Sequence, residues 1–140
     1  MYLCIFMLLS MSSSRELAMT LNTPFVNTSI KFDMQIPETC TYADLVFLST
    51  YKLIHTGPRL LKPIYKSIVA IMANIAPYTR NLSKDACDGI MYLVTVFTQP
   101  AFLTEKEDNC KTLTSLLECI NYLIAYQDDT NQHIQVQLLK

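Results

Sequence analysis

The stretch PRLLKPIYKSIVAIMANIA, residues 58–76, has the clearest periodicity in the sequence. Pro63 lies in its first turns, where a helix tolerates proline best, and Pro77 follows as a stop. The large apolar side chains recur at i, i+3, i+4 and i+7, which predicts a helix over 58–76 that buries one face. That face carries Leu61, Ile64, Tyr65, Ile68, Ile71, Met72 and Ile75.

The basic residues of this stretch fall on the other side of the same helix. Arg59, Lys62 and Lys66 are spaced i, i+3 and i+7, so we expect them to share a solvent-facing surface. Arg80 and Lys84 follow in the next turn. These five residues are our candidate surface for an acidic partner or an anionic membrane, and simple solvation of the side chains is the alternative.

Upstream, the pattern predicts a helix over residues 42–56. Thr41 and Asp44 have the spacing of a capping box, in which a hydroxyl and a carboxylate satisfy free N–H groups at a helix start. Gly57 followed by Pro58 is expected to end this helix in a left-handed cap.

The first 40 residues divide into a helical and an irregular part. Residues 2–21 predict a helix that is frayed or broken at three consecutive serines, 12–14. Residues 22–40 lose the periodicity and contain two prolines, which predicts a long connection with at most a short extended piece around Ile30–Phe32.

The rest of the chain repeats the layout of helix, proline and helix at an offset of about 42 to 48 residues, the period of HEAT and armadillo arrays. The predicted elements are a helix over 84–98 with Ser83 as N-cap, a charged loop over 104–109, a helix over 110–127, and a last helix over 130–140 capped by Asp129 or Thr130.

Together these patterns predict an all-α fold in which residues 1–140 form a single helical region. Apolar residues make up 51% of the chain and charged residues only 16%, so little polar material is left to cover a free-standing domain. We therefore expect a slice of a longer α-solenoid of HEAT- or armadillo-like helix pairs, with other segments of the same solenoid as its partners. A compact helical bundle is the alternative.

The same composition argues against an enzyme. The only glycines are Gly57 and Gly89, which excludes the clustered glycines of nucleotide-binding loops and nucleophile elbows. His55 and His133 lie far apart and outside any zinc or triad motif. The sequence therefore predicts no catalytic residue, no metal ligand and no cofactor, and the acidic run at 105–108 indicates a solvated turn.

Other global features point to the cytoplasm. Five cysteines without a paired spacing indicate reduced thiols. No apolar run reaches the roughly 18 residues that a transmembrane helix needs, and no aromatic-interleaved basic patch suggests nucleic-acid binding.

The charge is also split along the chain. Residues 41–84 hold six basic residues against one acidic, whereas residues 85–140 hold eight acidic against three basic. This split fits either a surface for an acidic partner or neighbouring layers whose charges complement one another.

A series of short segments, in their order and spacing, resembles the high-temperature-induced dauer formation protein family, a group of large, mostly helical proteins. The segments are Ser14-Arg15-Glu16, Leu21-Asn22-Thr23-Pro24-Phe25, Thr41-Tyr42-Ala43-Asp44-Leu45, Asn74-Ile75-Ala76-Pro77-Tyr78, Leu82-Ser83, Phe102-Leu103, Leu117-Glu118 with Asn121, and Tyr126-Gln127.

This resemblance implies a fragment of a non-enzymatic, peripheral trans-Golgi protein that supports dense-core vesicle formation and cargo sorting with protein partners of the secretory pathway. The alternative function is a self-contained small helical interaction domain, such as an apoptosis-regulator-like bundle.

Overall fold

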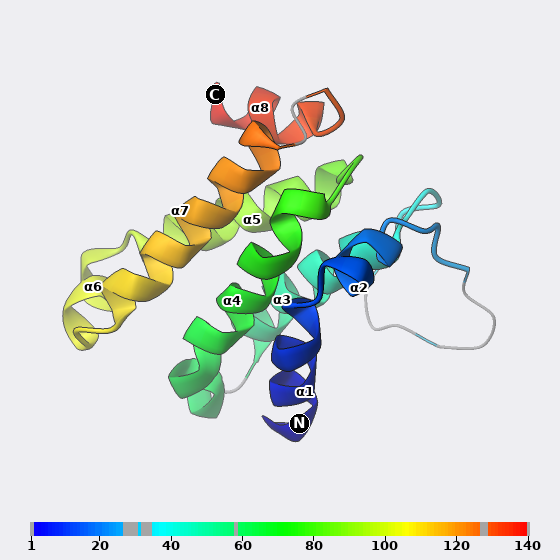
Figure 1. The fold of residues 1–140 in the computed structure, drawn as a ribbon. Helices are drawn as coiled ribbons and strands as arrows, with labels where there is room; N and C mark the ends of the chain where they lie inside the picture. Colours follow the sequence, from blue (N-terminus) through cyan, green and yellow to red (C-terminus); the bar gives the residue numbers. More distant parts are fainter. Residues whose placement is uncertain (1, 27–30, 32–34, 58, 127–128, 140) are drawn as a thin grey trace.

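The computed structural model describes residues 2–26, 31, 35–57, 59–126 and 129–139, with residues 59 and 60 described by their backbone only. The all-α class is confirmed, because the described residues form helices and no strand (Figure 1). In chain order the elements are α1 (Tyr2–Ser12), α2 (Arg15–Thr20), α3 (Tyr42–Thr56), the 3₁₀ helix η1 (Arg59–Ile64), α4 (Tyr65–Ile75), the 3₁₀ turn η2 (Ala76–Tyr78), α5 (Lys84–Phe97), α6 (Pro100–Glu105), α7 (Asn109–Ala125) and α8 (Gln132–Leu138).

The longer helices lie in two layers (Figure 1). In one layer α4 packs between α1 and α7, and in the other α3 packs against α5, on which α8 rests. α3 and α4 run antiparallel, because the start of α4 meets the end of α3 where the Tyr65 hydroxyl donates to the Ile54 carbonyl oxygen at 3.3 Å. α5 and α7 are antiparallel as well, since Asn131, just beyond α7, accepts a hydrogen bond from the backbone N–H of Leu82, just before α5.

The core fills the space between these layers. η1 and α4 together supply the predicted stripe, and the other three long helices turn one apolar face toward it. Burying a side chain of this size stabilises the fold by about 1.5–3 kcal/mol each relative to leaving it exposed. The largest fully buried members are Phe47, Leu61, Ile68, Met72, Ile75, Leu82, Ile90, Leu93, Phe97, Leu116, Leu123 and Ile134.

The start of α3 follows the prediction, and its end does not. Thr41 Oγ1 accepts a hydrogen bond from the Asp44 N–H at 3.1 Å, and the Asp44 carboxylate accepts one from the Thr41 N–H at 3.0 Å, which confirms the capping box. The left-handed cap is wrong, because Gly57 has φ −68° and ψ 155°, so the chain leaves α3 in an extended conformation. Glycine still fits this position, since a Cβ at residue 57 would overlap the Leu53 carbonyl oxygen.

The single helix predicted over 58–76 is three pieces. Residues Arg59–Ile64 form η1, and only Tyr65–Ile75 is α-helical. Pro63 has no N–H to donate, and inside an α-helix its ring would collide with the carbonyl four residues earlier, so this turn tightens into a 3₁₀ helix. Pro77 ends α4 in the same way, within η2.

The amino-terminal helix is broken where the serines predict a break. α1 ends at Ser12, and Ser14 caps α2 by accepting from the Leu17 N–H. Ile30 and Phe32, around which an extended piece is expected, lie outside the described residues, and Lys31 between them belongs to no helix or strand. Within the same connection, Pro24 forms an isolated antiparallel bridge with Thr41, the N-cap residue of α3.

Two predictions for the last third are wrong in detail. The loop expected over 104–109 is shorter, because α6 extends to Glu105 and α7 begins at Asn109. Pro100 opens α6 in its first turn, where the missing N–H of proline has no cost. Neither Asp129 nor Thr130 caps the last helix, whose N-cap residue is Asn131. The Asn131 side chain makes no cap bond there, because its Oδ1, the atom that would accept one, accepts from the Leu82 N–H instead.

Candidate functional site

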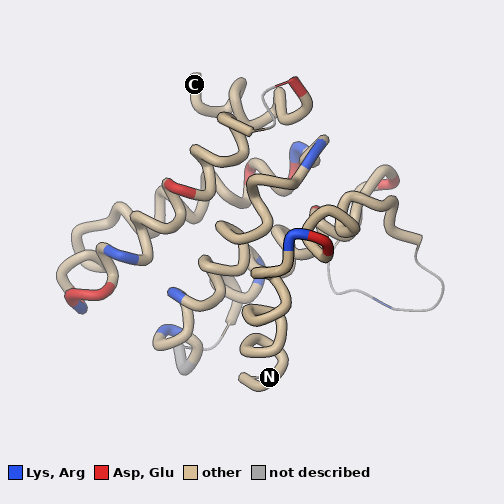
Figure 2. The backbone as a smooth tube through the Cα atoms, viewed as in Figure 1, with Lys and Arg blue, Asp and Glu red and all other residues tan. Residues whose placement is uncertain are grey.

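The five candidate basic residues separate into two groups (Figure 2). Lys62 and Lys66 are exposed near the start of α4, whereas Arg80 and Lys84 are exposed beyond its end. The eleven residues of α4 separate the groups by roughly 16 Å at 1.5 Å per residue. The Arg59 side chain lies outside the described residues. The stripe that the sequence predicts is therefore not continuous with Arg80 and Lys84.

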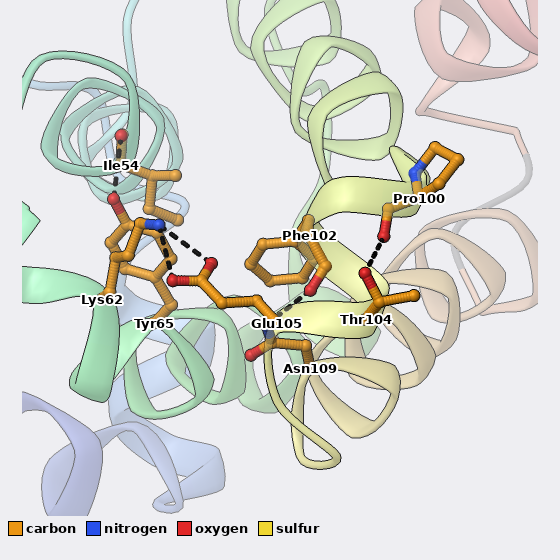
Figure 3. A network of polar contacts seen from close by, with 8 residues as sticks. All are labelled: Ile54, Lys62, Tyr65, Pro100, Phe102, Thr104, Glu105 and Asn109. Atoms are coloured by element: carbon orange, nitrogen blue, oxygen red, sulfur yellow. Dashed lines mark hydrogen bonds and ion pairs between the residues drawn. The ribbon is translucent and has the colours of Figure 1, made fainter.

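The first group faces carboxylates. Lys62 Nζ donates to both carboxylate oxygens of Glu105 in α6, at 3.0 and 2.9 Å (Figure 3). Both side chains are about 40% exposed, so this ion pair contributes at most about 1 kcal/mol. The hydrogen bond and charge of Lys111, and then the charge of Lys66, lower the pKa of Asp108. The fold thus places basic residues of η1 and α4 next to acidic residues in and after α6, so the two oppositely charged parts of the sequence meet here.

In the second group, Arg80 lies within the loop at residues 78–83 and Lys84 directly follows it. This loop connects the two antiparallel helix pairs. Asn22 holds one side of this loop: its Nδ2 donates to the Tyr78 carbonyl oxygen and its Oδ1 accepts from the Arg80 N–H, both at 2.8 Å. Asn131 holds the other side: its Nδ2 donates to the Thr79 carbonyl oxygen at 2.9 Å and its Oδ1 accepts from the Leu82 N–H at 3.0 Å. The backbone of the loop is thereby fixed by two asparagine side chains from distant parts of the chain.

Asp44 fixes the end of the same loop. This side chain is fully buried, and while one carboxylate oxygen completes the α3 capping box, the other accepts from the Ser83 N–H at 2.7 Å. Ser83 in turn caps α5 by accepting from the Ala86 N–H, as the sequence predicts. One carboxylate therefore connects the starts of α3 and α5. Asn81 occupies the remaining position with φ 53°, a left-handed conformation that asparagine tolerates.

Two pockets flank this loop, and they differ in charge. The first, about 460 Å³, is lined by Lys84 together with two carboxylates, Asp85 and Asp129, so it holds charges of both signs. The second, about 340 Å³, contains two basic side chains and no acidic one among its described lining residues. Those lining residues are Arg15, Met19, Asn22, Pro77, Tyr78, Arg80 and Tyr126.

No catalytic constellation appears elsewhere in the described part of the chain. His55 Nδ1 lies 2.9 Å from the Tyr92 hydroxyl and its ring stacks on Tyr51, an exposed cluster between α3 and α5. Burial raises the pKa of the Cys40 thiol to about 11 and that of Cys87 to about 12, so neither is a ready nucleophile. Within the described residues, no group of three or more metal-binding side chains comes together, and no helix combines the length and the hydropathy needed to cross a bilayer.

Sequence reasoning missed three residues of this region: Arg15, Asn22 and Asn131. Each stands at the edge of a connection, where a polar residue is ordinary and carries no periodic signal. A polar residue directly after the last apolar position of a helix was the available hint for Asn22. The partners of these residues are more than 50 positions away along the chain for Asn22 with Tyr78 and for Asn131 with Thr79, so only the fold reveals them.

Comparison with known proteins gives a consistent result. The family model described as "High-temperature-induced dauer-formation protein" matches residues 1–140. The chain is 33% identical over 135 residues to Protein HID1 of Dictyostelium discoideum, covering 96% of this chain and 15% of the relative. It is 31% identical over 141 aligned positions to Protein HID1 of Homo sapiens, covering 100% of this chain and 18% of the relative.

A more distant relative is the Ubp5-interacting protein ftp105 of Schizosaccharomyces pombe, 22% identical over 141 aligned positions, with 99% of this chain and 15% of the relative covered. The chain thus spans less than a fifth of the length of the relatives it matches. No solved structure matches it.

Proposed function

We propose, on the premise that this chain belongs to the high-temperature-induced dauer-formation protein family, that it is one segment of a longer, non-enzymatic helical scaffold. In this proposal the whole protein works in the secretory pathway, where it supports dense-core vesicle formation and cargo sorting. It acts from the cytoplasmic side as a peripheral protein of the trans-Golgi network, with protein partners of that pathway. The membership of the family supports the pathway, and the helix packing supports the scaffold.

The observation that carries the scaffold is the alternation of the layers along the chain. α1, α4 and α7 occupy one layer, while α3, α5 and α8 follow one another in the second (Figure 1). In chain order the six helices therefore switch layer at every step. This is how HEAT and armadillo arrays are built, where each helix pair buries its faces against the pairs before and after.

Both ends of this stack expose apolar side chains. At one end α1 presents Leu3, Phe6 and Met7, which are 70%, 67% and 55% exposed. Beside them an apolar groove of about 240 Å³ runs between α1 and α3, at the place where a further helix of the second layer would pack. At the other end Val136 and Leu138 are exposed. Since the relatives are more than five times longer, we propose that neighbouring segments of the same protein cover these faces.

A first experiment tests the scaffold. The isolated chain is expected to self-associate in light scattering and to bind a hydrophobic dye, because its end faces are uncovered. The triple substitution of Leu3, Phe6 and Met7 by Glu should make it monomeric. The matched control places three Glu residues at the exposed polar positions 95, 98 and 114, and should leave association unchanged. A stable wild-type monomer that binds no dye would support the self-contained helical bundle instead.

A second experiment tests the pathway. The full gene product that contains this chain, tagged and expressed in a secretory cell, is expected to overlap a trans-Golgi marker, and its depletion should lower the content of dense-core vesicle cargo. A distribution confined to the nucleus or to mitochondria, or normal vesicle content after depletion, would overturn this part of the proposal.

A further inference from the structure

The apolar groove of about 240 Å³ between α1 and α3 has walls from three helices. Ile5 and Leu8 of α1 form one wall, α3 forms the other, and Ile68 and Ile71 of α4 lie between them. We propose that this groove holds one amphipathic helix of about three turns, which belongs to the same longer protein and lies outside residues 1–140. The proposal rests on the scaffold proposed above and adds the chemistry of the helix that fills this groove.

The groove lies on the side of α3 that faces away from α5. Tyr51 marks the side that meets α5, because its ring packs against the Tyr92 ring at a centroid distance of 5.5 Å. Ser49 lines the groove and stands two positions before Tyr51, so the two side chains point about 200° apart around the helix. The groove is therefore where the next helix of the layer that contains α3 and α5 would pack.

The spacing along α3 fits a helix of limited length. The α3 wall consists of Tyr42, Leu45, Val46, Ser49 and Leu53 with Thr50 beside them, which repeat at helical spacing over about 16 Å. An amphipathic helix fills such a groove with side chains at i, i+3, i+4 and i+7, and about three of its turns span this length. Ser49 is the smallest side chain near the middle of the wall, so the largest side chain of the bound helix should pack there.

The chemistry of the groove selects an apolar partner. No charged side chain is among the described residues that line it. The hydroxyl of Thr50 already donates to the Val46 carbonyl oxygen at 2.6 Å, so it asks for no partner from outside. A charge on the buried face of the bound helix would find no counter-charge, and that face is therefore apolar. Such apolar interfaces are typical of permanently joined parts, whereas partners that associate and dissociate use more polar ones.

The length of the relatives favours a helix of the same protein as the occupant. This chain covers only 15% and 18% of two HID1 relatives, so most of such a protein lies outside residues 1–140. A helix of the same polypeptide reaches the groove at the high effective concentration that a covalent connection provides, whereas a separate protein has no such advantage.

The test is photo-cross-linking in the full gene product that contains this chain. A benzophenone amino acid replaces Tyr42, which lines the groove and is 41% exposed. The matched control places the same probe at Tyr92, which is 40% exposed on α5. The probe at position 42 is expected to react with one helix of the same polypeptide that lies outside residues 1–140 and carries an apolar stripe. The probe at position 92 should not react with that helix.

A second pair of variants tests the fit of the groove. Ser49→Phe puts a ring where the bound helix packs, and this overpacking should lower the yield of the cross-link from position 42 about fivefold or more. Thr95→Phe adds the same side chain at an exposed position of α5 and should leave the yield within about twofold. Far-ultraviolet circular dichroism of both variants distinguishes release of the helix from unfolding.

Three results would overturn the proposal: a cross-link from position 42 to a second copy or to a different protein, no cross-link from that position, or equal losses in the two phenylalanine variants. The scaffold is tested separately by the triple substitution in α1. If that substitution abolishes self-association while the cross-linking fails, the scaffold stands and the proposed occupant of the groove falls.

Discussion

Replacing Asp44 by alanine should destabilise this protein more than any other change of an acidic residue that we describe. The carboxylate is fully buried and accepts three hydrogen bonds: from the N–H and the hydroxyl of Thr41, both at 3.0 Å, and from the Ser83 N–H at 2.7 Å. The alanine variant leaves two backbone N–H groups without an acceptor at the starts of α3 and α5.

The magnitude follows from these bonds. A hydrogen bond to a charged group contributes about 1.5–3 kcal/mol, so the two backbone bonds sum to about 3–6 kcal/mol. Water reaches the half-buried Thr41 and Ser83 and replaces part of this, and removing the carboxylate also relieves its desolvation. We therefore expect the free energy of unfolding to fall by about 2–4 kcal/mol.

The assay is urea unfolding followed by far-ultraviolet circular dichroism, with Asp85→Ala as the matched control. Asp85 is exposed in the first turn of α5 and interacts with the helix dipole, which is worth about 0.3–1 kcal/mol. Equal losses for the two variants would refute the reasoning, because Asp44 would then act only as an ordinary helix-start acid and not as the link between two helix pairs.

Three further outcomes are expected. Asn131→Ala should lower the free energy of unfolding by about 2–3 kcal/mol, since a buried amide with three partners is lost. The control Asn121→Ala, at an exposed site, should change the free energy of unfolding by less than about 0.5 kcal/mol. Similar values for both variants in urea unfolding would contradict the role of Asn131. Ellman's reagent should titrate two thiols of the folded chain, Cys4 and Cys110, and all five only in denaturant; rapid reaction of all five under native conditions would contradict the described burial. The fold raises the pKa of Cys87 from its ordinary value of about 9 to about 12, so the folded state keeps the thiol proton at a pH where the unfolded chain loses it. The contribution of this thiol to the free energy of unfolding is complete below pH 9 and is lost as the pH rises toward 12. The stability of Cys87→Ala should therefore fall less steeply than that of the wild type between about pH 9 and 11.

The sequence predicted the helices best where local chemistry decides them. The capping box of Thr41 and Asp44, the N-cap at Ser83 and the break at the serine run all depend on groups within four residues of one another, and all three are present. Gly57 shows the limit of this logic. Glycine after a helix predicts a left-handed cap, but the backbone of Gly57 is extended. Glycine is favoured there for another reason, because a Cβ at residue 57 would collide with Leu53 and Leu61.

The candidate surface could be predicted only in part. The sequence predicts correctly that Lys62 and Lys66 are exposed, although Lys62 lies in η1 and Lys66 in α4, because helical periodicity separates them from the apolar face. It could not show that Lys62 meets Glu105, 43 positions away. It also could not show that Arg80 shares a pocket with Arg15 and not with Lys84, its near neighbour in the sequence.

By itself, the sequence determined the all-α class, the apolar face of each long helix and the family to which the chain belongs, because periodicity, caps and short family-like segments each depend on residues close together in the sequence. The tertiary structure alone decided which helices share a layer and which polar groups fix the connections. Asp44, Asn22 and Asn131 reach backbone groups 39 to 56 positions away along the chain. Such contacts depend on the three-dimensional packing of the helices, and a pattern of a few residues cannot specify it.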